Sequence, residues 1–288
     1  MIQKAGDVLG KGASGCVIHP PITCKTKKKY NNSHKKSKKV SKIVRILDKS
    51  NNRYKTKTSM LVNEINISSI IKENAKSFNY KPYDYFCLMH DFCKIPLSSI
   101  PKDDFEKCNL SSKYEYISLN LEKCGQDLTH ISSLQPLKTI TNLKKNIKHL
   151  LNGLKILKLN KIIHCDIKPQ NLTINDNLIK FIDFDASLYF PNFVRDTKNN
   201  KCNMNEFISR LAYTPGFLPP EVSYYLQRFK TNDWNELYEA IAIDMGLKEY
   251  TDDFFVFIDY LNTIPNLDEL LLCDKSLHIF KFDIFSLG

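Results

Sequence analysis

The chain has 288 residues, of which 42% are hydrophobic, so it can bury a substantial core as one large domain or as two lobes. Its formal charge of +11 indicates acidic partners, such as nucleotides or acidic protein surfaces. No stretch approaches the roughly 18 apolar residues that a membrane-spanning helix needs, so we expect no membrane partner.

The cysteine pattern argues against a disulfide framework. The nine cysteines are an odd number, and none belongs to a CxxC pair. The first residues, MIQKAGDV, lack the apolar core of a signal peptide. We therefore expect free thiols and a cytoplasmic location, or another reducing compartment inside a cell.

The N-terminal part has the pattern of a β-rich region. Residues 7–17 predict a strand, a glycine turn and a second strand, and Val40 to Ile46 predicts the next strand. The basic run from Lys25 to Lys39 favours a solvated loop, with salt-dependent binding of nucleic acid as the alternative. Thr58 to Ile71 combines apolar residues with good helix formers and predicts a helix.

The middle of the chain adds one strand and one long helix. Tyr114 to Leu121 predicts the strand, and Pro136 to Leu159 predicts the helix. We expect its apolar stripe to pack in the core. The stripe consists of Leu143, Ile147, Leu150, Leu151, Leu154 and Leu157.

The residues after this helix have the order that phosphoryl transfer needs. The motif HCDIKPQN, His164 to Asn171, is followed by FIDFD, Phe181 to Asp185. Asp166 could accept the proton of an attacking hydroxyl group, and Lys168 could neutralise charge on the moving phosphate. Two further residues could hold magnesium on the nucleotide, namely Asn171 and Asp183.

These motifs resemble those of eukaryotic-type Ser/Thr protein kinases, whose catalytic loop reads H-R-D-L-K-P-x-N and whose metal loop reads D-F-G. LGKGASGCV, Leu9 to Val17, is similar to the glycine-rich loop of the family, and YTPGFLPPE, Tyr213 to Glu221, to the end of its activation segment. FDIFSLG, Phe282 to Gly288, is similar to the opening of the long buried helix of the C-terminal lobe. In the family its aspartate, here Asp283, bonds the backbone of the catalytic loop.

The resemblance implies a bilobal fold of the α+β class. We expect residues 1–121 to form a β-rich N-lobe that includes the basic loop 25–39. Residues 122–288 would form a mainly helical C-lobe, incomplete because the chain stops where the long helix opens. The segment 222–281 is longer than the usual link between the flanking motifs and is expected to be an insert, either in place of the later helices or as a peripheral subdomain.

The resemblance also implies ATP and Mg²⁺ as cofactors. Lys42 is the expected phosphate-binding lysine, with Glu64 as its helix partner and Glu73 as the alternative. Glu122 and Cys124 would present backbone groups to adenine, and an ordinary strand end is the alternative for this segment. The expected nucleotide-binding residues are Leu9, Gly10, Lys11, Gly12, Ala13, Ser14, Gly15, Cys16, Val17, Val40, Lys42, Glu64, Glu122, Cys124 and Asp127.

The expected partner is a protein substrate with a serine or threonine acceptor. Lys168 favours this acceptor, and so does Thr214, whose family counterpart bonds the catalytic aspartate and lysine. Composition and the V-S-K strand are similar to kinases of large DNA viruses, which would place the protein in a host cell or a virion.

Three positions depart from the family pattern. Cys165 replaces an arginine, Asp185 replaces the glycine of D-F-G, and Thr173 replaces an apolar residue beneath adenine. Asp185 would bear a conformational cost if it needed a positive φ. These departures keep open an alternative function, that of a degenerate kinase that binds nucleotide or a partner without turnover.

Overall fold

The computed structural model of the protein describes residues 7–11, 15–22, 24, 39–48, 53–54, 57–131, 143–175, 177–196, 201–202, 256 and 283. Its contacts divide the chain into two units. Unit 1 comprises Met1–Gln126 and Thr173–Asp185, and unit 2 comprises Asp127–Leu172 and Ala186–Gly288. The domain boundary expected after residue 121 stays a prediction.

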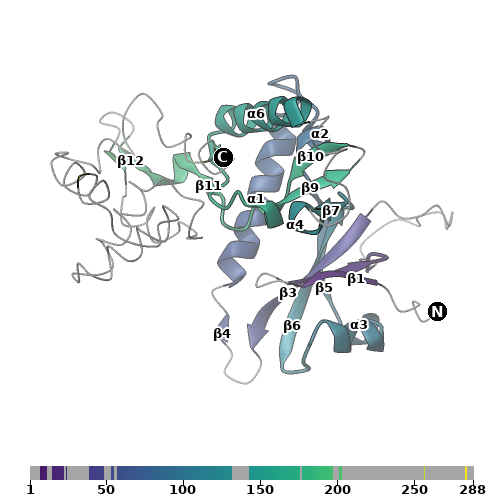
Figure 1. The fold of residues 1–288 in the computed structure, drawn as a ribbon. Coiled ribbons are helices and arrows are strands. Elements are labelled where there is room, and N and C mark those ends of the chain that lie inside the picture. The colour runs from purple at the N-terminus through teal and green to yellow at the C-terminus, as the bar shows by residue number, and fades with distance from the viewer. Residues whose placement is uncertain are drawn as a thin grey trace. The chain divides into compact units, whose positions relative to one another are not determined.

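A six-stranded antiparallel sheet forms the body of unit 1 (Figure 1). The strands follow the order β1-β2-β3-β6-β5, and β4 pairs with β3. They are β1 (Asp7–Lys11), β2 (Cys16–His19), β3 (Lys39–Asp48), β4 (Arg53–Tyr54), β5 (Met89–Ile95) and β6 (Tyr114–Glu122). The predicted hairpin at 7–17 and the predicted strands at 40–46 and 114–121 are confirmed as β1, β2, β3 and β6.

The third strand buries side chains on both faces of the sheet. Ile43 packs in one core cluster with Tyr116. Val44 packs in another cluster with Leu61 of helix α1. Because side chains alternate along a strand, Lys42 shares the face of Val44 and is directed toward α1. The register of β3 thus brings a lysine to the helix.

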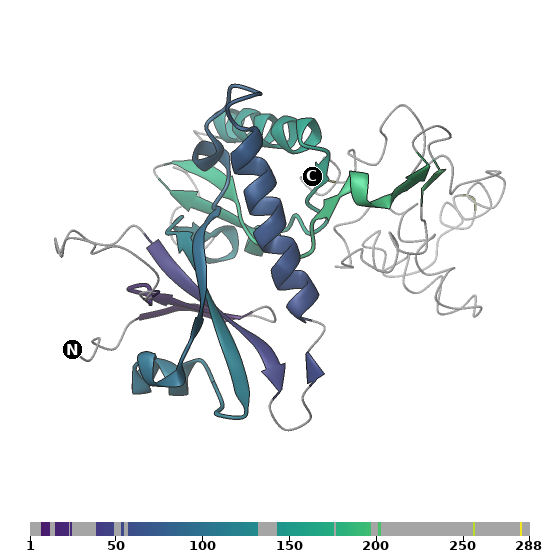
Figure 2. The same cartoon turned by 180° about the vertical axis from the view of Figure 1, so that it is seen from behind.

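Helix α1 (Lys57–Asn74) confirms the helix predicted at 58–71. Figure 2 shows it running alongside the sheet of unit 1, and it contacts β3. Its buried side chains recur every three or four residues, as an amphipathic helix requires. They are Leu61, Glu64, Ile67, Ser68 and Ile71. The stripe therefore carries one carboxylate, Glu64, into the core.

Shorter elements complete unit 1. They are α2 (Pro82–Tyr85), η1 (Leu97–Ser99), α3 (Lys102–Lys107), β7 (Gln126–Asp127), β9 (Leu172–Asn175) and β10 (Leu178–Phe181), of which β7 and β9 reach the unit boundary. The last three strands form a second sheet in the order β10-β9-β7. Phe86 forms a parallel bridge with Phe181 and packs edge-on against Phe184, with ring centroids 5.8 Å apart. This aromatic contact anchors the segment that follows β10.

Three disulfide bonds lie in unit 1, so the expectation of free thiols is wrong. The bonds are Cys16–Cys108, Cys24–Cys93 and Cys87–Cys124. Their partners are 92, 69 and 37 residues apart, and only the folded strands bring them together. An odd cysteine count without CxxC pairs could not show this, and it gives no support for a reducing compartment. Among the described residues, Cys165 is a free, buried thiol.

Unit 2 contains one long helix and several short elements. They are α4 (Leu128–Ile131), α6 (Leu143–Leu159), β8 (Ile162–Ile163), η2 (Pro169–Asn171), β11 (Leu188–Tyr189), η3 (Phe190–Phe193), β12 (Val194–Asp196) and β13 (Lys201–Cys202). Strand β8 pairs with β11, and β12 pairs with β13. Helices and antiparallel sheets together confirm the α+β class.

The helix α6 ends at Leu159 as predicted, but its buried stripe is narrower than expected. Leu150, Leu154 and Leu157 are buried, whereas the side chains of Ile147 and Leu151 are 48% and 38% exposed. The two exposed residues lie on the flank of the stripe, where helical geometry turns them away from the buried line 150-154-157. Apolar spacing located the helix but overestimated its buried width.

Several predicted features lie outside the described residues. They include the basic loop 25–39 apart from Lys39, the first part of the predicted long helix, residues 136–142, the insert 222–281 apart from Val256, and Thr214. Within the described ranges, no helix combines the length and apolar character that crossing a membrane requires.

Candidate active site

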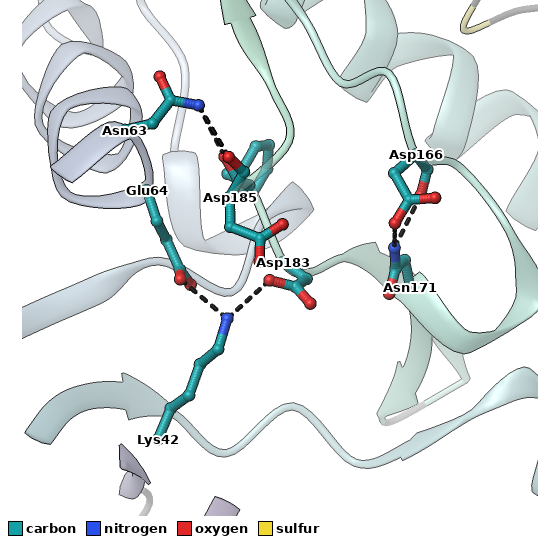
Figure 3. A network of polar contacts seen from close by, with 8 residues as sticks. Lys42, Asn63, Glu64, Asp166, Asn171, Asp183 and Asp185 are labelled. Atoms are coloured by element: carbon teal, nitrogen blue, oxygen red, sulfur yellow. Dashed lines mark hydrogen bonds and ion pairs between the residues drawn. The ribbon is translucent and has the colours of Figure 1, made fainter. Parts of the chain in front are cut away.

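Lys42 lies between two carboxylates in unit 1 (Figure 3). Its Nζ atom donates to Glu64 Oε2 at 2.8 Å and to Asp183 Oδ1 at 2.6 Å. The three side chains come from β3, from α1 and from the loop after β10. The structure therefore brings together the expected phosphate-binding lysine, its helix partner and one expected metal ligand, and it selects Glu64 rather than Glu73.

Burial makes this cluster electrostatically strong. The side chains of Lys42 and Glu64 are only 7% and 6% exposed, and that of Asp183 is 25% exposed. Burial alone would lower the pKa of Lys42, but the carboxylates of Asp183, Glu64 and Asp185 outweigh burial and raise it. Lys42 is therefore a fixed positive charge at neutral pH, suited to bind phosphate oxygens.

The loop after β10 contains a residue with a left-handed backbone, but this residue is not Asp185. Asp183 has φ 63°, so the positive φ falls on the aspartate that meets Lys42 and not on Asp185. Aspartate tolerates this region better than most residues. Replacing the family's glycine at 185 consequently carries no positive-φ cost here, and the expected strain at Asp185 is absent.

Backbone groups of this loop also contact α1. Asn63 Nδ2 donates to the carbonyl oxygen of Asp185 at 3.0 Å and lies 3.5 Å from that of Phe184 (Figure 3). Phe184 itself is 2% exposed. Sequence reasoning missed Asn63, although its place directly before Glu64 on a predicted helix is a signal that could have raised it.

A second polar cluster lies within one loop of unit 2. Lys168 Nζ pairs with Asp166 Oδ1 at 2.8 Å. Asn171 Nδ2 donates to Asp166 Oδ2 at 2.7 Å and to the Asp166 carbonyl oxygen at 2.8 Å (Figure 3). Lys168 is extended, with φ −155° and ψ 164°, as Pro169 after it requires. The structure thus brings three predicted catalytic residues together.

Asp283 holds the start of this loop. Its carboxylate accepts hydrogen bonds from the backbone N–H of His164 at 2.7 Å and of Cys165 at 3.0 Å. The backbone of Cys165 is left-handed, with φ 65°, so the chain turns at this residue between His164 and Asp166. This is the contact that the resemblance implied for Asp283. Burial raises the pKa of the Cys165 thiol, so it is a poor nucleophile in this position.

The glycine-rich segment is described only in part, because Gly12, Ala13 and Ser14 lie outside the described residues. Leu9, Gly10 and Lys11 belong to β1, and Cys16 and Val17 to β2. A Cβ atom at Gly15 would lie 2.5 Å from the carbonyl oxygen of Ile43, so β3 itself requires glycine there. Nothing lies within 4 Å of a Cβ atom at Gly10. Packing alone thus explains glycine at position 15, and its role toward phosphate stays a prediction.

The expected adenine and ribose positions have contacts of their own. Glu122 Oε1 lies 3.5 Å from Lys180 Nζ. The side chain of Cys124 forms the disulfide with Cys87, which leaves its backbone groups as the ones that could meet adenine. Asp127 accepts a hydrogen bond from the backbone N–H of Thr129 at 3.0 Å and bonds His130, so it caps the turn into α4. Their roles toward a nucleotide stay predictions.

Thr173, the departure expected beneath adenine, is buried and 5% exposed, as is the expected nucleotide-binding residue Val40. The Thr173 hydroxyl lies 3.8 Å from Cys87 Sγ, next to the disulfide with Cys124. A polar side chain is therefore accommodated by a sulfur contact in the core of unit 1.

Each of the two expected metal ligands offers an oxygen atom of the kind that magnesium prefers. In the described part of the chain, no three His, Cys, Asp or Glu side chains gather as a metal site. Asp183 offers a carboxylate and Asn171 an amide oxygen, and Mg²⁺ usually takes one or two such protein ligands and completes its shell with phosphates and water. These residues would hold the ion only as part of a metal–nucleotide complex.

Comparison with known proteins identifies the family. The model of the protein kinase domain family matches residues 4–234 of the chain. This range includes the two polar clusters but not Asp283. It also includes the glycine-rich, catalytic and metal loops that carry the resemblance.

Individual relatives are more distant. The chain is 30% identical over 123 residues to a calcium/calmodulin-dependent protein kinase kinase of Caenorhabditis elegans, covering 42% of this chain and 19% of that protein. It is 32% identical over 108 residues to cyclin-dependent kinase 9-A of Xenopus laevis, covering 37% and 27%. It is 26% identical over 113 residues to the liver/testis phosphorylase b kinase gamma catalytic chain of Rattus norvegicus, covering 39% and 25%. The matches thus span about a quarter of each relative or less.

Proposed function

Because the chain belongs to the protein kinase family, we propose that it transfers the γ-phosphate of ATP to serine or threonine hydroxyl groups of proteins. The observation that carries the proposal is the buried contact of Lys42 with Glu64 and Asp183. A lysine, a helix glutamate and a metal-loop aspartate in contact are the parts that protein kinases need to bind a metal–nucleotide complex.

The residues of unit 1 would bind the nucleotide. Lys42 would neutralise phosphate oxygens, and Glu64 would hold its ammonium group in place. When Mg²⁺ is bound, it supplies charge neutralisation at the phosphates, and Asp183 would be one of its ligands. The contact between Lys42 Nζ and Asp183 Oδ1, 2.6 Å long, supports this assignment because it brings the carboxylate next to the lysine that would bind the phosphates.

The residues of unit 2 would act on the acceptor. Asp166 would take the proton of the attacking hydroxyl, and Lys168 would stabilise charge on the transferred group. The hydrogen bonds from Asn171 fix the orientation of the Asp166 carboxylate. Asn171 uses its amide nitrogen for these bonds, so its amide oxygen is the atom that could bind the metal.

The choice of serine or threonine as acceptor is also part of the proposal. It is supported by Lys168 in the catalytic loop, by Thr214 in the sequence and by the kind of relative that matches. Similarity to kinases of large DNA viruses and a location in a host cell or a virion remain proposals that composition supports. Magnesium as the metal rests on the oxygen donors Asn171 and Asp183.

The proposal is tested with the full chain, MgATP labelled at the γ-phosphate and a mixture of basic protein substrates. We expect label on serine or threonine that is stable in acid and removed by base. The substitution Asp166→Asn should abolish incorporation. Unchanged incorporation by this variant would contradict the assignment of Asp166.

A degenerate kinase remains the second candidate, because Asp185 and the buried Thr173 depart from the family pattern. Its function would be nucleotide-dependent binding without turnover. Thermal denaturation with and without MgATP, measured beside incorporation, separates the candidates. A rise in Tm without any incorporation would favour the degenerate kinase.

A further inference from the structure

The loop from Asp183 to Asp185 must hold one carboxylate against Lys42. Asp183 has a left-handed backbone, and Phe184 is buried in the aromatic contact with Phe86. Phe184 fixes one side of the loop through apolar packing. The backbone carbonyl groups of Phe184 and Asp185 are hydrogen-bond acceptors, so a side chain that donates to them can hold the loop from its polar side.

Asn63 supplies that donor from α1. Its amide nitrogen lies 3.0 Å from the Asp185 carbonyl oxygen and 3.5 Å from that of Phe184. The next residue of the helix, Glu64, bonds Lys42 at 2.8 Å. Two consecutive helix residues therefore act on the two partners of one ion pair, Glu64 on Lys42 and Asn63 on the loop that carries Asp183 (Figure 3).

The chemistry of an amide suits this position. The surroundings already contain three carboxylates, those of Glu64, Asp183 and Asp185, which all act on Lys42. A second lysine would compete for those carboxylates, and an aspartate would add a like charge without a donor. Asparagine donates to a carbonyl group and leaves the charge of the cluster unchanged.

We propose that Asn63 is a positioning residue for magnesium binding, which holds the backbone of Phe184 and Asp185 so that the Asp183 carboxylate stays in its metal-binding position. This inference rests on the proposed function, because it concerns the same metal–nucleotide site. It gives α1 a second role beside the bond from Glu64 to Lys42, namely to hold a loop that carries aspartate where the family has glycine.

The decisive experiment compares Asn63→Ala with Asn66→Ala. Asn66 is an exposed residue of the same type on the same helix, so it controls for the loss of an asparagine from α1. The magnesium concentration that gives half-maximal binding of ATP is measured at fixed ATP concentration. We expect this concentration to rise about fivefold for Asn63→Ala, the effect of losing one hydrogen bond, and to stay unchanged for Asn66→Ala. Asn63→Asp should raise it further.

A merely structural role would give a different result. It would lower Tm and weaken ATP binding by the same factor at every magnesium concentration. That outcome, or equal magnesium dependence in Asn63→Ala and Asn66→Ala, overturns the inference.

A second measurement stays informative if the protein binds no ATP. Amide hydrogen exchange of residues 184–187 is followed in protein free of metal and nucleotide. We expect exchange to be about fivefold faster in Asn63→Ala than in Asn66→Ala, because the loop loses one hydrogen bond. Equal exchange would overturn the inference, whereas absent ATP binding in the wild-type protein would overturn the proposed function.

Discussion

Units 1 and 2 build their polar clusters in different ways. In unit 1, Lys42 and Asp183 are 141 positions apart and meet only because a sheet, a helix and a loop pack together. In unit 2, Asp166 and Asn171 are five positions apart and meet within one turn of chain. The first cluster depends on tertiary packing and the second on local backbone geometry. Substitutions in the first cluster should therefore affect stability as well as nucleotide binding, and substitutions in the second mainly the rate of phosphate transfer.

Asp166→Asn should have the largest effect and should leave stability untouched. We expect the rate of phosphate transfer to fall by about 10³-fold, because the proton acceptor is lost. Tm should change by less than about 2 °C, since the loop keeps its shape and the new side chain has similar size. Label incorporation and thermal denaturation measure the two quantities, with the exposed Asp103→Asn as control. A large fall in Tm would show that the loop is not an independent local structure.

Reduction of the disulfides should destabilise unit 1 and spare unit 2. Each bond closes a long loop and typically contributes about 2–4 kcal/mol. We expect dithiothreitol to speed amide exchange in β3 and β6, with a much smaller effect in α6. Mass spectrometry of peptides from the unreduced protein should recover Cys16–Cys108, Cys24–Cys93 and Cys87–Cys124. Recovery of nine free thiols would contradict the structure of unit 1.

Lys42→Met tests whether packing holds the first cluster. The change leaves Glu64 and Asp183 without their cation, and we expect a loss of about 3 kcal/mol in the free energy of unfolding together with loss of ATP binding. Chemical denaturation measures the first effect. Lys94→Met is the matched control, because the Lys94 side chain is 64% exposed in its pair with Glu115 and should contribute at most about 1 kcal/mol. Equal stability of the two variants would refute a buried ionic cluster.

Asp283→Ala should lower both the stability of the protein and the rate of phosphate transfer, each to an intermediate extent. It removes the acceptor for the backbone N–H groups of His164 and Cys165, at a cost of about 2 kcal/mol. Because these groups position the loop before Asp166, we also expect slower phosphate transfer with ATP affinity nearly unchanged. Asp283→Asn keeps one acceptor oxygen and should lie between wild type and Asp283→Ala. Wild-type rates in both variants would exclude a positioning role for Asp283.

A change of pH should produce the smallest effect. The pKa of Lys42 is raised above its ordinary value of 10.5, so its contribution to stability is complete below that value and is lost only at higher pH. The stability difference between wild type and Lys42→Met should therefore stay constant from about pH 7 to pH 9. Denaturation at several pH values measures it. A difference that shrinks within this range would mean that Lys42 loses its proton earlier.

The same contrast explains what the sequence could predict. The catalytic loop could be predicted because its residues are close in sequence and their order is specific to phosphoryl transfer. The helix partner Glu64 could be predicted because the family resemblance implied a helix glutamate, but the sequence left Glu73 open as an alternative. The sequence could not predict the three disulfides or the contact of Asn63 with Asp185, since these contacts join positions that only packing brings together. The exposed flank of α6 at Ile147 and Leu151 was misread because apolar spacing does not show how wide a buried face is.

The most direct test of the central claim is a crystal structure of the protein with magnesium and an ATP analogue that resists hydrolysis. We expect Lys42 Nζ to contact the nucleotide phosphates and Asp166 to face the γ-phosphate. Oxygen atoms of Asp183 and Asn171 should bind the metal. A nucleotide bound elsewhere, or one that engages Lys42 while Asp166 and Asn171 contact neither metal nor phosphate, would contradict the central claim.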